Sequence, residues 1–92
     1  GSMRIIQLYP QVQNFLRTLA PTPKKRLREA LRQLSQLDGD LRELEAPLEG
    51  YHRLRVAHYR IILKIHEDRI DCIFAERRSI VYEIFEITLG SE

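Results

Sequence analysis

The sequence predicts an α+β domain in which an N-terminal strand and a two-helix hairpin pack on an antiparallel sheet, followed by a short C-terminal segment. Two observations predict this class. Apolar residues recur at helical spacing through residues 12–37, whereas residues 51–77 form three runs rich in Ile, Leu, Val, Tyr and Phe, separated by short polar turns. The chain has 92 residues, 43% of them apolar, which suits one small soluble domain and is too short for two ordinary cores. Gly1-Ser2 is interpreted as a cloning remnant before Met3, and residues 3–92 as the domain.

The first third of the chain predicts a strand and a helix. Arg4–Tyr9 is apolar enough for a partly buried strand, and Pro10 ends it. The helix that follows has one apolar face, formed by Val12, Phe15, Leu16 and Leu19.

A second helix is predicted after the break at residues 20–23. Thr22 is expected as its N-cap and Pro23 as its first residue, and residues 38–40 end it. Its apolar stripe is formed by Leu27, Ala30, Leu31, Leu34 and Leu37. Lys25, Arg28 and Arg32 line the opposite side.

Three antiparallel strands are predicted at Tyr51–Ala57, Tyr59–His66 and Arg69–Arg77. Ile61, Ile62 and Leu63 are consecutive and apolar, which indicates burial on both faces of the sheet. Residues 80–89 fit either a short helix or a last strand, because their periodicity does not decide.

The turns of this sheet predict its register. A symmetric hairpin around Ala57-His58 places Arg55 opposite Arg60. A turn at Glu67-Asp68 places Lys64 opposite Asp71 as a cross-strand ion pair. The same two registers pair Leu54 with Ile61, Arg53 with Ile62, Ile61 with Phe74, Ile62 with Ile73 and Arg60 with Ala75.

Alternation along the strands then gathers arginines on one face, namely Arg53, Arg55, Arg60 and Arg77. The core side chains on the other face are Leu54, Val56, Tyr59, Ile61, Leu63, Cys72 and Phe74. Residues 51–64 hold four basic residues and no acidic one. Like charges in direct cross-strand pairs destabilise a sheet, so this face predicts an anion site. The alternative is a solvated basic face whose acidic neighbours come from Glu43, Glu45, Glu49 or Glu76.

Two segments carry a family resemblance. Residues 48–62, LEGYHRLRVAHYRII, resemble the L-x-G-x-x-R-L-R-V-G-x-Y-R-I-I-Y core of the RelE/ParE superfamily of toxin-antitoxin toxins. Residues 76–82, ERRSIVY, resemble its closing H-R-R-x-x-Y element, with Arg77 in place of the His and one added residue before the Tyr. The resemblance covers essentially the whole chain and implies the RelE-like fold.

For the RelE-like branch the resemblance implies a ribosome-dependent mRNA interferase acting in the A site of the 70S ribosome. The 2'-hydroxyl attacks the adjacent phosphate, the 5'-oxygen leaves and a 2',3'-cyclic phosphate forms. The implied catalytic residues are Arg55, Arg60, Arg78 and Tyr82. The resemblance implies Arg53 and Arg77 as RNA-binding residues, and the charge of the helical stripe Lys25, Arg28 and Arg32 predicts contact with RNA backbone. For the helical stripe, a solvated face is the alternative.

The sequence does not decide which residue accepts the 2'-hydroxyl proton, or whether the target is RNA or DNA gyrase. An arginine is not deprotonated at pH 7, whereas Tyr82 could position or deprotonate the 2'-hydroxyl or stack on a base. His52 and His58 are the nearby groups with a suitable unperturbed pKa. Alternatively Tyr82 is a core aromatic beside Phe85. ParE-like members of the fold act on DNA gyrase and generally lack the late tyrosine, and a catalytically inert binding protein is a further alternative.

Partners and cofactors complete the expectations. The resemblance implies a cognate antitoxin, with operator DNA bound only through the antitoxin complex. The single cysteine, Cys72, is expected to be buried and inert, and no metal or cofactor is predicted. No apolar run is long enough to cross a membrane, so we expect a cytoplasmic protein.

Overall fold

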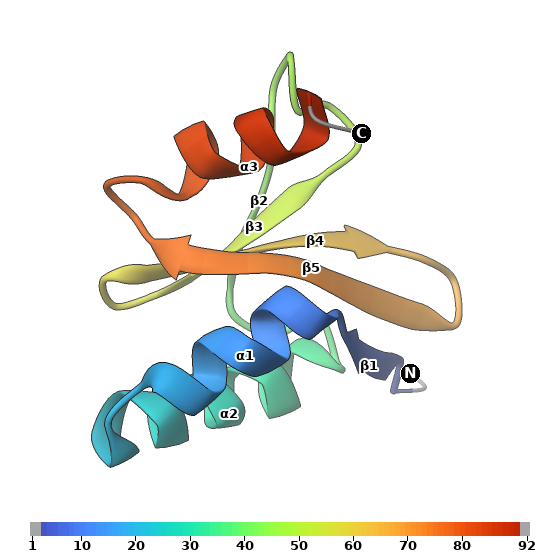
Figure 1. Ribbon diagram of the computed structural model, residues 1–92. Helices are drawn as coiled ribbons and strands as arrows, with labels where there is room; N and C mark the ends of the chain where they lie inside the picture. The colour runs from blue at the N-terminus through green and yellow to red at the C-terminus, as the bar shows by residue number, and fades with distance from the viewer. Residues whose placement is uncertain (1–2, 91–92) are drawn as a thin grey trace.

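The computed structural model describes residues 3–90, so the interpretation of Gly1-Ser2 lies outside the described residues. Five strands and three helices are present in this range (Figure 1). They are β1 (Ile5–Leu8), α1 (Pro10–Thr18), α2 (Pro21–Leu34), β2 (Asp40–Glu43), β3 (His52–Val56), β4 (Tyr59–Ile65), β5 (Arg69–Arg77) and α3 (Val81–Gly90).

The strands form one mixed sheet in the order β1-β5-β4-β3-β2. Strands β3, β4 and β5 are antiparallel, as predicted, and β2 adds a further antiparallel pair with β3. Strand β1 runs parallel to β5, with Ile5 beside Arg69 and Leu8 beside Cys72, so the sheet as a whole is mixed and not antiparallel throughout. Strand β2 was not predicted, because it has four residues and none of its side chains is fully buried.

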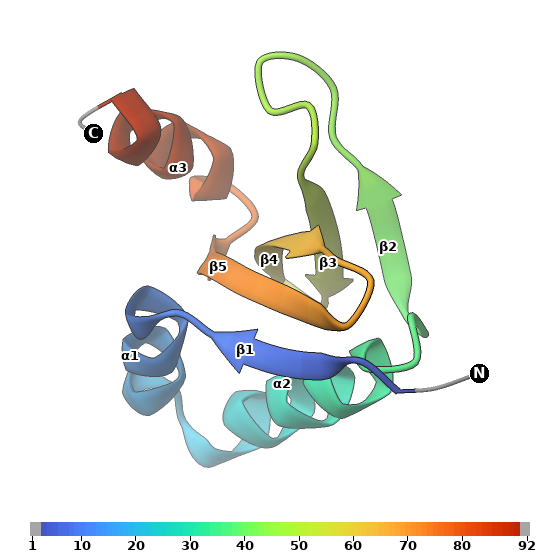
Figure 2. The same ribbon diagram turned by 90° about the vertical axis from the view of Figure 1, so that its right-hand side faces the viewer.

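The helical hairpin covers one face of the sheet, as predicted (Figures 1 and 2). Its core is completed by strand residues whose side chains alternate onto this face. The buried members are Val12, Leu16, Leu27, Leu31, Leu34, Leu54, Val56, Ile61, Leu63, Ile70, Cys72 and Ala75.

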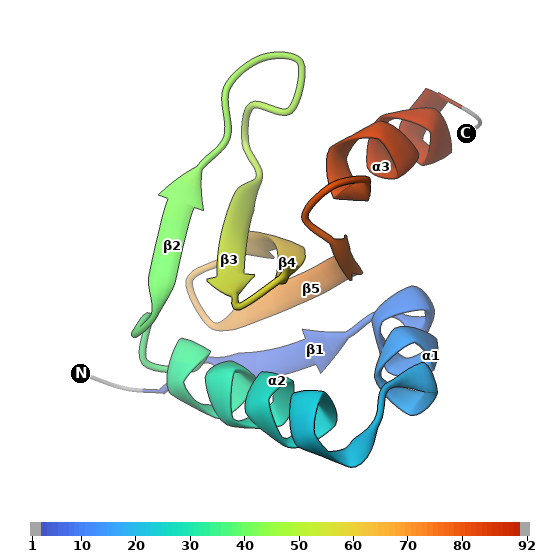
Figure 3. The ribbon, with the colours of Figure 1, turned by 90° about the vertical axis from the view of Figure 1, so that its left-hand side faces the viewer.

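The C-terminal segment is a helix, and α3 lies on the opposite face of the sheet (Figures 1 and 3). A second, smaller core forms beneath it from Leu48, Ile62, Phe74, Val81 and Phe85. The Phe85 ring contacts Phe74 and Tyr51, with centroids 5.6 and 5.2 Å apart. This second core is why Ile61, Ile62 and Leu63 are all buried in succession, as the sequence predicts.

Both ends of α2 differ from the expectation. The N-cap is Ala20 and Pro21 is the first residue, so Thr22 is not the cap. Both prolines fit the first turn, where backbone N–H groups have no helical partner. At the other end, Leu37 leaves the predicted stripe: it is 40% exposed and has a φ of +58°, and the bonds Leu37 N to Leu34 O and Asp38 N to Gln33 O close a Schellman-type cap around it.

Candidate functional site: an arginine face beside Tyr82

The β3–β4 hairpin has the predicted register and brings two arginines face to face. Arg55 lies directly opposite Arg60, with Val56 opposite Tyr59 at the turn. Ala57 in this turn has a φ of +54°, a conformation that favours glycine. The turn nevertheless forms, and its tightness is what fixes the Arg55–Arg60 pair.

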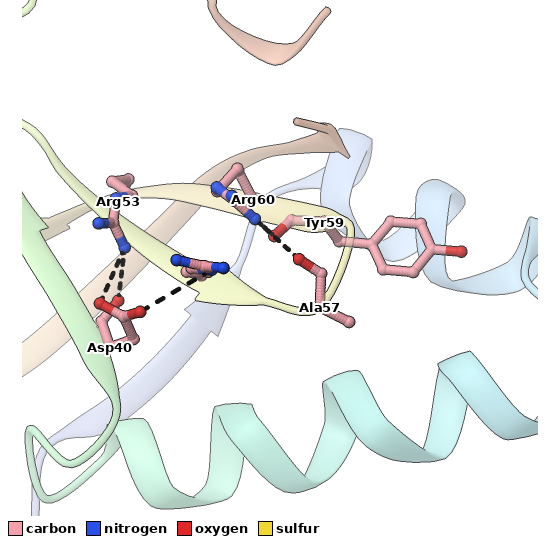
Figure 4. Close-up of polar contacts among 6 residues, drawn as sticks. Asp40, Arg53, Ala57, Tyr59 and Arg60 are labelled. Atoms are coloured by element: carbon pink, nitrogen blue, oxygen red, sulfur yellow. Dashed lines mark hydrogen bonds and ion pairs between the residues drawn. The ribbon is translucent and has the colours of Figure 1, made fainter. Parts of the chain in front are cut away.

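Arg60 is the central residue of this face. It is only 9% exposed, which is unusual for an arginine. Its Nη1 donates to the carbonyl oxygens of Ala57 (3.0 Å) and Tyr59 (2.8 Å), so the hairpin itself holds the guanidinium (Figure 4). Both protons of Nη1 are then in use, which leaves the edge formed by Nε and Nη2 for a bidentate anion.

The electrostatics around Arg60 identify its neighbours. Burial lowers the pKa of the Arg60 guanidinium, and the charge of Arg55 lowers it further, with smaller effects in the same direction from Arg53 and Arg78. Tyr82 acts in the opposite direction and raises this pKa. Three guanidiniums and one phenol thus lie within electrostatic range of one buried charge. An anion bound here would relieve the repulsion.

Asp40 is the acidic residue that forms ion pairs with this face. Its Oδ1 lies 3.1 Å from Arg53 Nη1, which also donates to the Asp40 carbonyl at 2.9 Å, and its Oδ2 lies 4.0 Å from Arg55 Nε (Figure 4). Our expectation named four glutamates as acidic neighbours, and one of them, Glu76, is the cross-strand partner of Arg60; the carboxylate that pairs with Arg53 and Arg55, Asp40, was not among them. The reason is that Asp40 reaches the arginines through β2, where it is the cross-strand partner of Arg55.

Strand β2 also contributes an arginine that sequence reasoning missed. Arg42 is exposed and lies opposite Arg53, so it joins the same face. The alternation in Asp40-Leu41-Arg42-Glu43, with Leu41 packed against the core, was the available signal. We use the name arginine face for Arg42, Arg53, Arg55 and Arg60 together with Arg78.

A β-bulge in β5 changes the predicted second register. Lys64 pairs with Asp71 and Leu63 with Cys72 as expected, but Ile73 is an extra residue, and from there each partner shifts by one. Arg60 therefore faces Glu76 and not Ala75, while Ile61 faces Ala75 and Ile62 faces Phe74.

The shift removes two residues from their expected faces. Arg77 lies opposite Tyr59, on the side of the helical hairpin, so its predicted place on the arginine face is wrong. Phe74 lies in the core under α3 and not in the core of the hairpin.

The predicted Lys64–Asp71 ion pair is wrong, although the two residues are cross-strand partners as predicted. Asp71 accepts from Arg69 and contacts His66, and the Lys64 ammonium lies 4.7 Å from the centre of the Tyr51 ring.

Arg78 and Tyr82 reach the arginine face from the segment after β5. The Arg78 amide donates to the His58 carbonyl at 2.8 Å, which ties this segment to the β3–β4 turn. Tyr82 is half-buried and packs against the core under α3, so it has the core contacts that the alternative interpretation expected. The same residue also acts electrostatically on Arg60, so both interpretations describe part of its position.

The two candidate histidines are placed differently. His58 is exposed in the turn beside Arg78. His52 lies opposite Leu63, on the hairpin side of the sheet, and its Nδ1 is buried without a hydrogen-bond partner. Only His58 is therefore close to the arginine face.

The predicted RNA-binding stripe on α2 lies on the other side of the sheet. Lys25, Arg28 and Arg32 are exposed, and Arg28 and Arg32 border a groove of about 530 Å³. Its apolar lining comes from Ile6, Leu8, Leu16 and Leu31. The structure thus separates the stripe from the arginine face and does not join them into one site.

Three further properties concern a membrane span, a metal site and the single cysteine. None of the helices within residues 3–90 is long and apolar enough to cross a membrane. In the same range, no three His, Cys, Asp or Glu side chains are grouped so that they could hold a metal ion. Cys72 is buried, and burial raises the pKa of its thiol to about 12.

The fold is that of RelE-like toxins. A chain of the toxin-antitoxin complex RelBE2 from Mycobacterium tuberculosis superimposes with a TM-score of 0.75 and 18% identity, over 84% of this chain and all of that one. The RelE-RelB complex from Pyrococcus horikoshii gives 0.69 and 21%, over 84% and 97% of the two chains. The YoeB dimer from Staphylococcus aureus gives 0.66 and 16%, over 84% and 99%. No family model and no curated protein matches the sequence.

Proposed function

We propose that this chain is the toxin of a type II toxin-antitoxin module and inhibits translation as an mRNA endoribonuclease. One observation carries the proposal: Arg60 is buried in the sheet with Arg55, Arg53, Arg78 and Tyr82 around it. A phosphate is the ligand whose charge and oxygen geometry match such a group of guanidiniums. The likeness in fold to RelE, YoeB and YafQ structures supports the proposal.

In this proposal the arginines hold the scissile phosphate. The free edge of Arg60 takes two phosphate oxygens, and Arg55 and Arg78 neutralise the charge that grows as the 2'-oxygen attacks. Two arginines of the face are held before substrate arrives, Arg60 by two carbonyls and Arg53 by Asp40. Little reorganisation is then needed at the transition state.

Tyr82 serves the proton transfer or the positioning of the attacking hydroxyl. The guanidiniums remain charged at pH 7 and cannot accept the 2'-proton. Tyr82 is the proton-carrying group that acts on Arg60, and His58 is exposed in the neighbouring turn. We assign Tyr82 to the 2'-hydroxyl, whose proton passes to Tyr82 in its phenolate form or to solvent water that Tyr82 positions, and the 5'-oxygen leaves with a proton from solvent or from His58.

The ribosome supplies the in-line geometry of the mRNA, and the α2 stripe contacts ribosomal RNA. Lys25, Arg28 and Arg32 are exposed and lie on the face of the molecule away from the scissile phosphate. Such a stripe can bind phosphate backbone without competing with the arginine face for the substrate.

The experiment is cleavage of mRNA by the purified protein on programmed ribosomes, with detection of 2',3'-cyclic phosphate ends. Arg60→Ala and Tyr82→Phe are expected to lose cleavage and growth arrest while keeping a cooperative thermal transition. Full growth arrest by both variants would contradict the proposal. A parallel supercoiling assay with gyrase, and a protein that is inert in both assays, would identify the two alternatives.

The proposed partner is a cognate antitoxin that covers the arginine face with an acidic, amphipathic segment. Several of the structures similar to this one are toxin-antitoxin complexes, which supports this partner. Co-purification with the product of the adjacent gene tests it, and binding to operator DNA is expected only from the complex. We place the pair in the cytoplasm, where mRNA and ribosomes are.

A further inference from the structure

The edge of β5 is completed by a side chain where β1 ends. Strand β1 pairs with β5 as far as Cys72, whose carbonyl accepts from the Tyr9 amide at 2.9 Å. Helix α1 then begins at Pro10 and the backbone leaves the sheet. The Gln11 side chain continues the pairing: Nε2 donates to the Ala75 carbonyl at 2.8 Å, and Oε1 accepts from the Ala75 amide at 2.7 Å. One amide thus replaces a strand residue.

The bulge residue lies between these two attachment points. Ile73 is the extra residue of β5, Cys72 before it is bonded to Tyr9, and Ala75 after it is bonded to Gln11. A bulge leaves its strand locally unpaired and free to slip by one residue, so fixing both sides holds the register.

That register decides what surrounds Arg60. With the bulge, Glu76 faces Arg60 and Phe74 packs against Phe85 of α3. Without it, Phe74 would turn to the other face of the sheet and Arg77 would come to the side of Arg60. Helix α3 carries Tyr82, so the packing of Phe74 against this helix also sets the distance between Tyr82 and Arg60.

We propose that Gln11 is a positioning residue of the arginine face: its amide locks the β5 bulge and thereby aligns Arg78 and Tyr82 with Arg60. Gln11 itself lies at the far edge of β5 and acts through Ala75. The inference rests on the proposed function where it is tested by RNA cleavage, whereas its test by amide exchange does not depend on that function.

The test compares Gln11→Leu and Gln11→Glu with the matched control Gln13→Leu. Gln13 lies on the same helix and donates to the Leu8 carbonyl at 2.9 Å, so its loss removes a similar bond away from the bulge. Leucine removes both Ala75 bonds. Glutamate can accept from the Ala75 amide but cannot donate to the carbonyl, and so separates the two.

Amide exchange followed by NMR is the structural readout. For Gln11→Leu we expect exchange at Ala75 to accelerate at least about tenfold and shift changes to concentrate in residues 73–82, with little change for Gln13→Leu. Gln11→Glu keeps the bond from the Ala75 amide and loses the bond to its carbonyl, so Ala75 protection should stay close to the parent while smaller shift changes appear in residues 73–82. For Gln11→Leu, unchanged exchange at Ala75, or shifts spread evenly over the domain, overturns the inference. If the leucine variant does not fold, the absence of shift changes in residues 73–82 of Gln11→Glu overturns it.

Cleavage kinetics is the second readout. Misalignment without loss of the anion site should lower kcat about 10- to 100-fold for Gln11→Leu with KM within about twofold, and Gln13→Leu should match the parent. If the parent protein cleaves RNA and Gln11→Leu cleaves equally well, the positioning role is wrong. If the parent cleaves no RNA, the proposed function fails, and the NMR shift of Tyr82 on titration with inorganic phosphate decides the inference: a response like that of the parent in Gln11→Leu overturns it.

Discussion

Asp40→Asn should change stability and anion binding in opposite directions. The Asp40 carboxylate lies 3.1 Å from one guanidinium of the arginine face and 4.0 Å from another, and it is the built-in counter-ion that a bound phosphate must compete with. The Asn side chain keeps the shape and an acceptor oxygen, and the backbone bond from Arg53 to the Asp40 carbonyl remains. The substitution therefore removes charge and little else.

The size of the stability loss follows from the exposure of Asp40, and the size of the affinity gain follows from the distance between its carboxylate and the bound phosphate. Asp40 is 53% exposed, so losing its pair with Arg53 should cost about 0.5–1 kcal/mol and lower Tm by about 2–8 °C. A phosphate on the far edge of Arg55 would lie roughly 6–9 Å from the Asp40 carboxylate, where a unit charge in a water-like dielectric repels it by about 0.5–0.7 kcal/mol. Affinity for a phosphate or RNA ligand should accordingly rise about two- to threefold at low salt.

The assay pairs thermal unfolding with fluorescence anisotropy of a labelled RNA oligonucleotide, at low and at high salt. Asp38→Asn is the control, because Asp38 is exposed in the preceding turn and has the same charge. We expect the affinity gain to shrink as salt rises, since exposed charges are screened. Weaker RNA binding by Asp40→Asn, or an equal gain from Asp38→Asn, would refute the view that the arginine face is the anion site.

Four further outcomes are expected. Leu37→Gly should raise the free energy of unfolding by about 0.5–1 kcal/mol in urea titrations, because Leu37 has a left-handed φ of +58° at the end of α2; a lower midpoint would contradict this. Cys72 should resist iodoacetamide at pH 8 and react in denaturant, because burial raises its pKa to about 12. Equal labelling of the folded and the unfolded protein would contradict this. The folded state favours the neutral thiol, so the contribution of Cys72 to the free energy of unfolding is complete below about pH 8.5 and should be lost as pH rises from 9 toward 12, as measured by urea titration. Arg28→Gln with Arg32→Gln should weaken ribosome association and reduce its salt dependence while leaving the binding of a free RNA oligonucleotide to the arginine face unchanged, and weaker binding of the free oligonucleotide with unchanged ribosome association would count against a separate ribosome contact.

The hairpin register was predictable and the β5 register was not. The two-residue turn after Val56 leaves one way to pair β3 with β4, and so Arg55 and Arg60 are opposite each other as predicted. The β5 residue after the bulge, Ala75, is bonded to Gln11, 64 residues earlier in the chain, and no local pattern in β5 indicates the bulge. Arg77 was misplaced for this reason.

Sequence patterns also failed to predict short elements and residues in conformations that their side chains disfavour. Strand β2 has four residues and is defined by its pairing with β3, so its short alternation was too weak a signal to assign Asp40 and Arg42 to the site. Leu37 adopts a conformation that its side chain disfavours, so a propensity argument extends the helix past its true end. The helical state of 81–90 depends on packing against Phe74 and Tyr51, which the sequence does not reveal locally.

The parallel pairing of β1 with β5 has a consequence for how the protein is made. Ile5 pairs with Arg69, so the sheet closes only after β5 has been synthesised, and contacts of such sequence separation form late in folding. Arg78 and Tyr82 follow β5 in the chain. A nascent chain that has emerged from the ribosome only as far as β4 therefore has neither a closed sheet nor a complete arginine face. High contact order, ordinarily a cost in folding rate, here places assembly of the site at the end of the folding of this domain.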